Sequence, residues 1–144
     1  MDLTFGQSEI FAPAVVVAAL YFVTLIRLMS KRIPAINAAK LQPDELKTSS
    51  YRQQLAANVD VPAQHLTNLT EFPPLFLILA VMFYVTGNVD DTVMWMAWGY
   101  AGLRIIHSAI HLGYNNPMHR AIVYLLSMVI LLALWIKFAL DVVF

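Results

Sequence analysis

Polar side chains recur at helical spacing in four stretches of a chain that is otherwise strongly apolar. Because residues three, four and seven positions apart share one face of a helix, each stretch carries a polar stripe. The stripes are Tyr21, Thr24 and Arg27; Gln64, Asn68 and Glu71; Arg104, His107 and His111; and Arg120, Tyr124 and Ser127. Guanidinium groups bind carboxylates through two parallel hydrogen bonds, and the carboxylate of Glu71 can hold an ammonium group. The stripes therefore predict a polar cavity between helices for an anionic ligand that also carries an amine.

The elements that must position these stripes are four apolar stretches, each long enough to cross or nearly cross a bilayer. A membrane-spanning helix needs about 20 apolar residues. The predicted spans cover residues 10–29, 62–86, 92–113 and 120–141, in a single domain of residues 1–144. Hydrophobic residues make up 60% of the chain and charged residues only 12%, which is far from the composition of soluble domains. The predicted fold class is an all-α integral membrane protein with a bundle of four transmembrane helices.

The charges that remain predict an orientation and exclude several functions. Lys and Arg gather in the segment 30–61, and the segment 113–119 ends at His119 directly before Arg120, whereas the opposite ends of the spans are acidic. By the positive-inside rule these two segments face the cytoplasm and both termini face away from it, in a multi-pass protein of the cell inner membrane. The net charge of zero and the absence of a basic run argue against a nucleic-acid partner. The chain has no cysteine, so disulfides and cysteine-based sites are excluded.

The second and third stripes also have plainer interpretations. Arg104 lies inside a predicted span, where an ionisable group is usually functional, but it could also snorkel or pair with Glu71. Gln64 and Asn68 could form hydrogen bonds between helices. His107 and His111, spaced i and i+4, could bind a metal ion together with Glu71, although Arg104 one turn away would repel a dication. All four stripes lie toward the same side, which favours the cavity, and we predict no metal site.

The second predicted span contains a local disruption. Pro73 and Pro74 lack the N–H groups that the carbonyls of Leu69 and Thr70 would bind in a regular helix. We therefore expect the helix to bend there, next to Glu71.

Three sequence runs resemble motifs of a known family. They are Gln64-His-Leu-Thr-Asn68-Leu-Thr-Glu71-Phe-Pro-Pro-Leu-Phe-Leu77, Arg104-Ile-Ile-His107 and Arg120-Ala-Ile-Val-Tyr124. Their order and separation resemble the span-two, span-three and span-four motifs of the MAPEG superfamily, the membrane-associated proteins in eicosanoid and glutathione metabolism. The resemblance covers residues 64–124, and the first span matches by topology.

This resemblance implies a left-handed bundle assembled as a homotrimer, with glutathione held between neighbouring subunits. It implies that Asn68 and Glu71 contact the glutathione backbone, that His107 and Tyr124 line the same site, and that Arg120 lies beside the sulfur. A guanidinium there favours the thiolate, which attacks a hydrophobic electrophile or a lipid hydroperoxide. The candidate catalytic residues are Arg120 and Tyr124. The candidate residues for binding glutathione, the co-substrate, are Arg27, Gln64, Asn68, Glu71, Arg104, His107 and His111.

Three positions depart from the family's pattern. Gln64 stands where the family usually has Arg, His111 where Tyr is common, and Phe72 lacks the hydroxyl of the usual aromatic residue. Arg27 is a candidate substitute for the missing cation. These departures keep open a second interpretation, a non-catalytic protein that binds lipid or regulates a partner on the same scaffold.

Overall fold

The structure of the protein is a computed structural model that describes residues 5–47, 51, 55 and 57–144. These residues form helices and turns and no strand. The helices are η1 (Gln7–Ile10), α1 (Phe11–Ala38), η2 (Glu45–Lys47), α2 (Ala57–Glu71), α3 (Pro73–Thr86), α4 (Asp91–Leu112), α5 (Pro117–Phe138) and η4 (Ala139–Val143). The all-α fold class is therefore confirmed.

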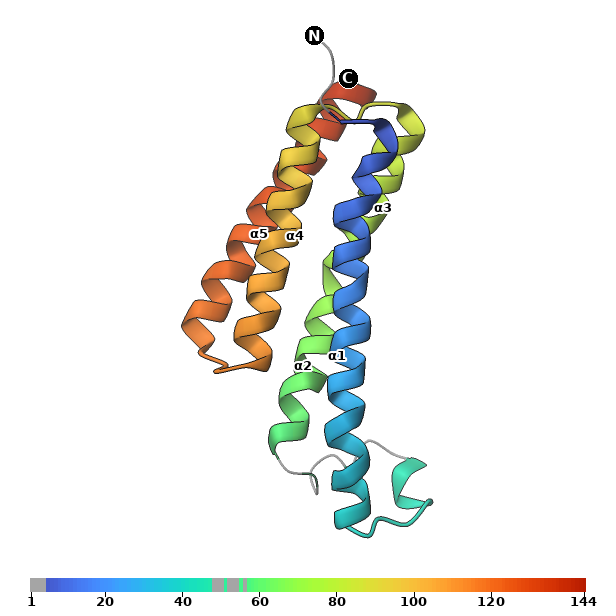
Figure 1. Cartoon of the computed structure of the whole chain (residues 1–144), viewed down its shortest axis with the longest axis vertical. Helices are drawn as coiled ribbons and strands as arrows, with labels where there is room; N and C mark the ends of the chain where they lie inside the picture. The colour runs from blue at the N-terminus through green and yellow to red at the C-terminus, as the bar shows by residue number, and fades with distance from the viewer. Residues whose placement is uncertain (1–4, 48–50, 52–54, 56) are drawn as a thin grey trace.

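The helices form an up-and-down bundle (Figure 1). We call the end that holds both termini and the turn between α3 and α4 the terminal end, and the opposite end the loop end. At the loop end α1 and α2 extend beyond the turn that joins α4 to α5 (Figure 1). Helix α4 packs against α5, α1 and α2, which are the three long helices that surround it near the loop end.

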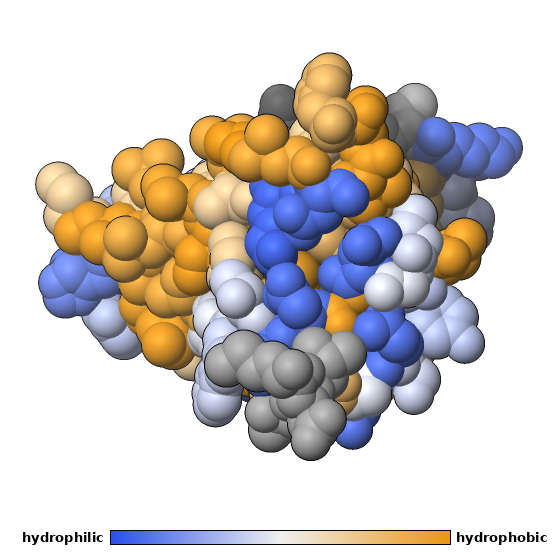
Figure 2. Space-filling model, turned by 90° about the horizontal axis from the view of Figure 1, so that it is seen from above, coloured by the Kyte–Doolittle hydropathy of each residue, from blue (hydrophilic) through white to orange (hydrophobic). Residues whose placement is uncertain are grey.

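Among the described residues, three helical segments are long and apolar enough to cross a membrane, namely Gln7–Ala38, Val59–Thr86 and Pro117–Val143. Helix α4 is the fourth rod and has 22 residues, but it is less apolar because it carries Arg104, His107 and His111. Many large apolar side chains are exposed along the bundle, as lipid contact requires. Figure 2 looks onto the terminal end and shows a patch of hydrophilic side chains, with hydrophobic ones to the left of it and above it.

The apolar core occupies the half of the bundle nearer the terminal end. Small residues such as Ala80, Ala97 and Ala101 are fully buried there and allow helices to approach closely, which matters in lipid because packing replaces the hydrophobic effect. The core ends at the stacked rings of Phe76 and Tyr100, whose centroids are 4.5 Å apart. One turn further along α4 lies Arg104, where the polar half of the bundle begins.

Local signals at the terminal end fix where the helices begin and end. Helix α3 stops at Gly87, whose φ of 69° is in the left-handed region that glycine adopts freely. Asp90 caps α4 by accepting a hydrogen bond from the N–H of Val93 at 2.7 Å, and Lys137 forms an ion pair with Asp90 at 2.8 Å. Burial favours the neutral form of Asp90, but the hydrogen bonds from Lys137 and Val93 outweigh it and lower the pKa of this carboxyl.

The predicted bend at the two prolines is confirmed. Helix α2 ends at Glu71 and α3 begins at Pro73, with Phe72 outside both helices. The carbonyl of Leu69, which lacks its usual donor at Pro73, accepts a hydrogen bond from the hydroxyl of Tyr21 on α1. Tyr21 therefore supplies the donor that the proline removes, and it ties α1 to the break beside Glu71.

We expect Tyr21→Phe to destabilise the protein by about 1–2 kcal/mol, because it leaves the Leu69 carbonyl without a partner. Thermal unfolding in detergent measures the effect, and Tyr114→Phe, which removes an exposed hydroxyl at the loop end, is the control. In a Pro73→Ala background residue 73 regains an N–H, so the same substitution should have a smaller effect. Equal losses in both backgrounds would show that Tyr21 does not compensate for Pro73.

Candidate functional site

Four of the nine predicted site residues line one cavity of about 220 Å³ near the loop end. Asn68 comes from α2, His107 from α4, and Arg120 and Tyr124 from α5. Pro117 and Ala121 complete the lining. Residues from three sequence runs therefore meet in one place.

Arg120 reaches this cavity because of how α5 begins. The side chain of Asn116 caps the helix by accepting hydrogen bonds from the N–H groups of Met118 and His119, at 3.0 and 3.2 Å. This cap places Arg120 in the first turn, where the helix dipole already favours negative charge. A guanidinium beside a helix N-terminus adds to the same positive potential, so this corner of the cavity is suited to an anion.

Two neutral acceptors hold the Arg120 side chain. Its Nη1 donates to Nε2 of His111 at 3.1 Å and to Oδ1 of Asn115 at 3.0 Å. Within the described residues neither contact is to a carboxylate, and Arg120 forms no ion pair there. The guanidinium therefore keeps its full positive charge at the wall of the cavity.

Arg104 lies behind the cavity wall and is fully buried, at 0% exposure. Its Nε donates to the hydroxyl of Tyr100 at 3.0 Å, and its guanidinium carbon lies 5.2 Å from the ring centroid of Tyr100 and 5.0 Å from that of Tyr124. Its Nη1 has no partner among the described residues, and it neither snorkels nor pairs with Glu71. Two aromatic faces stabilise the charge in part, but the two N–H bonds of Nη1 still lack acceptors.

A cluster of three buried histidines lies beside the two arginines. His65 on α2 packs against His111 and His107 on α4, with ring centroids 4.8 and 5.5 Å apart, and its Nε2 lies 2.9 Å from Oγ of Ser108. Our sequence analysis did not single out His65 as a site residue. The available signal was its spacing of four from Leu69, which places both on the face of α2 that is buried in the bundle.

The remaining predicted residues lie apart from this cavity in the single chain. Gln64 and Glu71 are exposed on α2, and His111 is buried behind Arg120 rather than in the lining. Arg27 is exposed on α1 and lines a separate cavity of about 190 Å³ together with Lys31. A ligand that contacts all nine residues therefore needs more surface than one chain presents in this cavity.

The described residues give no support to the metal alternative. They contain no group of three His, Asp or Glu side chains placed to hold a metal ion. In the histidine cluster, Nε2 of His65 faces Ser108 and Nε2 of His111 accepts from Arg120, so these nitrogens do not converge on a common point.

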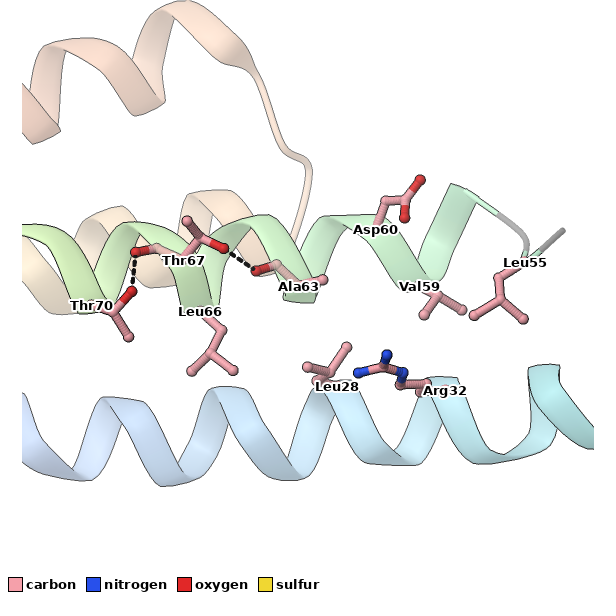
Figure 3. Close-up of a pocket in the computed structure, with 9 residues that line it drawn as sticks. All are labelled: Leu28, Arg32, Leu55, Val59, Asp60, Ala63, Leu66, Thr67 and Thr70. Carbon is pink, nitrogen blue, oxygen red and sulfur yellow. Dashed lines mark hydrogen bonds between the residues drawn. The ribbon is translucent and has the colours of Figure 1, made fainter. Parts of the chain in front are cut away.

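A different cavity of about 270 Å³ lies between α1 and α2 (Figure 3). Leu28 and Arg32 line it from α1, and Thr67 and Thr70 are among its lining residues on α2. The two threonine hydroxyls donate to backbone carbonyls within α2, of Ala63 and Thr67 respectively. None of the nine predicted site residues lines this cavity, so it is separate from the cavity that contains Arg120.

Taken together, the fold and the cavity define a helical membrane protein with a cation-lined site between its helices. The MAPEG family model matches residues 10–140, and the chain therefore belongs to the MAPEG family. This family contains membrane proteins of eicosanoid and glutathione metabolism, among them glutathione transferases, peroxidases and non-catalytic members. No curated protein and no solved structure matches the chain.

Proposed function

We propose that this protein is a membrane-bound, glutathione-dependent transferase or peroxidase that acts on a hydrophobic electrophile or a lipid hydroperoxide. The observation that carries the proposal is Arg120, a guanidinium at the wall of the cavity that is held by neutral acceptors and has no carboxylate partner among the described residues. Such a group favours a thiolate over a thiol, because an opposite charge nearby stabilises the ionised form.

The other polar groups suit the rest of glutathione, which has two carboxylates and one ammonium group. Nη1 of Arg104 has no partner among the described residues and is a donor for a carboxylate that displaces the cavity wall in front of it. Asn68 offers an amide at the wall itself. Glu71 forms no ion pair with the described residues, so its carboxylate is available for the ammonium. The charges of these groups are therefore complementary to those of glutathione, the co-substrate of the family.

The reaction follows from the thiolate. In conjugation, the sulfur forms a bond to the electrophilic carbon of the second substrate, and the leaving group departs with its electron pair. In peroxide reduction, two glutathione molecules are oxidised to the disulfide while the hydroperoxide is reduced to an alcohol and water. The ring of Tyr124 contacts the rings of Phe72 and His107, and in the proposed reaction Tyr124 orients the reacting groups at the cavity. Exposed apolar residues of α5, such as Ile122 and Leu125, give a lipid-soluble substrate access from the bilayer.

The exposed polar residues of α2 support a homotrimer. Gln64, Thr67, Thr70 and Glu71 are exposed within a helix able to cross a membrane, and polar groups that face lipid are unfavourable. A second copy packed against this face would cover them and bring further residues to the cavity. We also propose that the bundle is left-handed, that the protein lies in the cell inner membrane, and that both termini face away from the cytoplasm.

The second candidate is a non-catalytic protein that binds lipid or regulates a partner. It is favoured by Gln64, which supplies no charge and lies outside the cavity, and by the placement of Arg27 in a separate cavity. Both observations reduce the number of cations available for a glutathione carboxylate in a single chain.

We expect the detergent-purified protein to bind glutathione with a dissociation constant of about 1 mM or lower, as titration calorimetry can measure. Ophthalmic acid, which has a methyl group in place of the thiol, should bind without the absorbance of a thiolate near 240 nm and serves as the matched ligand. Mass measurement in the same detergent should give three chains. Absence of glutathione binding by a folded trimer would favour the non-catalytic candidate.

A further inference from the structure

We propose that His111, supported by His65, is a positioning residue that orients Arg120 toward the thiolate while leaving the charge of Arg120 intact. The inference rests on the proposed function and concerns how its central guanidinium is held. It assigns to His111 a role behind the cavity wall rather than contact with the ligand, and it gives His65 a role for the first time.

The hydrogen bond between Arg120 and His111 has only one polarity. A guanidinium has donors and no acceptor, so Nε2 of His111 must present its lone pair to Nη1 of Arg120. The proton of the neutral imidazole then resides on Nδ1. His111 is fully buried and lies outside the cavity lining, so its imidazole is available to Arg120 rather than to a ligand in that cavity.

His65 holds the His111 ring in place. The rings of His65 and His111 pack with centroids 4.8 Å apart. His65 is in turn held by a hydrogen bond with Ser108, which lies one turn before His111 on α4. Because α2 supplies His65, α4 supplies Ser108 and His111, and α5 supplies Arg120, this chain of contacts joins three helices. A rotation of the His111 ring would have to displace His65, so the acceptor stays directed at α5.

The neutrality of the acceptors is the important chemical feature. A carboxylate would also hold the Arg120 guanidinium, but it would offset the positive charge that stabilises a thiolate. His111 and Asn115 hold Nη1 without adding negative charge. The neutral side chains of His111 and Asn115 therefore fix the orientation of Arg120, while the positive charge of Arg120 remains available to the ligand.

Three substitutions at residue 111 separate these tasks. Glutamine keeps a neutral acceptor near the position of Nε2, phenylalanine keeps a ring without an acceptor, and glutamate keeps an acceptor but adds a negative charge. The control is His119→Gln, which changes an exposed histidine that contacts Tyr114 outside the cavity. All variants are compared as folded protein of the same oligomeric mass in detergent.

We expect the thiolate fraction of bound glutathione, read from its ultraviolet absorbance at neutral pH, to fall about tenfold in His111→Phe and in His111→Glu. His111→Gln should stay within about threefold of the parent protein, and His119→Gln should not change. In turnover the losses should appear in kcat more than in KM. A purely structural role of His111 would instead give equal thiolate fractions in all folded variants, which would overturn the inference.

A second measurement does not require glutathione. The rate at which phenylglyoxal modifies Arg120, mapped by peptide mass spectrometry, should rise in His111→Phe and remain near that of the parent protein in His111→Gln. If glutathione does not bind but these rates differ as expected, the proposed function fails while the positioning of Arg120 stands. Equal rates in the two variants would show that His111 does not hold Arg120.

Discussion

Replacement of Arg120 by glutamine is expected to slow turnover about 100-fold or more and to leave little bound glutathione as thiolate at neutral pH. Removal of one group that stabilises developing or localised negative charge typically has an effect of this size. Binding of glutathione should weaken much less, because Asn68, Glu71 and Arg104 are also expected to contribute to its affinity. The charge on the sulfur, by contrast, depends mainly on the guanidinium at the cavity wall. The hydrogen bonds of Nη1 to His111 and Asn115 hold that guanidinium in place.

Arg120→Lys is the matched variant for this experiment. It retains a positive charge but loses the planar group that bonds two acceptors at once, so it should restore activity only in part. The ultraviolet absorbance of bound thiolate, titrated against pH in the parent protein and both variants, gives the comparison. Identical titration curves for Arg120→Gln and the parent protein would leave Arg120 as an anchor at the membrane interface and the site without an activating group.

The features of the fold that the sequence predicts best are local ones. The break at Phe72 follows from two missing N–H groups, whose effect does not depend on what packs nearby. Helix α5 begins at Pro117, three residues before the predicted span at residue 120, and the cause is again local, because Asn116 and Pro117 favour a helix N-terminus. Helical spacing also predicts a shared polar cavity, and Asn68, His107, Arg120 and Tyr124 line one cavity, whereas the other five predicted site residues do not line it.

Spacing does not reveal which neighbour a polar face meets. His107 and His111 lie on one stripe of α4, yet His107 lines the cavity beside Tyr124, whereas His111 lies outside the lining and accepts a hydrogen bond from Arg120. His65 falls outside the polar stripe of α2 and faces the buried side, where its partner Ser108 comes from another helix. Such partners depend on the rotation of whole helices about their axes, which packing determines and one sequence does not display.

Arg104 raises a different question, because it is a buried cation without a carboxylate partner among the described residues. An uncompensated charge in the interior is destabilising, and the two tyrosine faces and the Tyr100 hydroxyl offset only part of that effect. A side chain that destabilises the free protein in this way is typical of a binding site that is completed by its ligand. If Arg104 belongs to such a site, its partner is a carboxylate that arrives from outside the chain.

Removal of the Arg104 charge is therefore expected to raise the stability of the ligand-free protein and to weaken glutathione binding. Arg104→Met, which replaces the guanidinium by an apolar side chain, should stabilise the ligand-free protein by about 1–4 kcal/mol, as replacing buried charges by packed apolar residues has done elsewhere. The same variant should bind glutathione at least about tenfold more weakly. Arg32→Met, which changes a half-buried arginine on α1 outside this site, is the control and should alter neither quantity greatly.

Unfolding in detergent, with and without glutathione, measures both effects in one experiment. A ligand at 100 times its dissociation constant stabilises the folded state by about 2.7 kcal/mol, so the parent protein should show a clear gain that Arg104→Met largely loses. If Arg104→Met instead destabilises the ligand-free protein by about 3–5 kcal/mol, the guanidinium already has an anionic partner. In a homotrimer that partner would be a carboxylate of a second copy, such as Glu71, which is exposed and forms no ion pair with the described residues. The charge of Arg104 would then serve assembly rather than ligand binding.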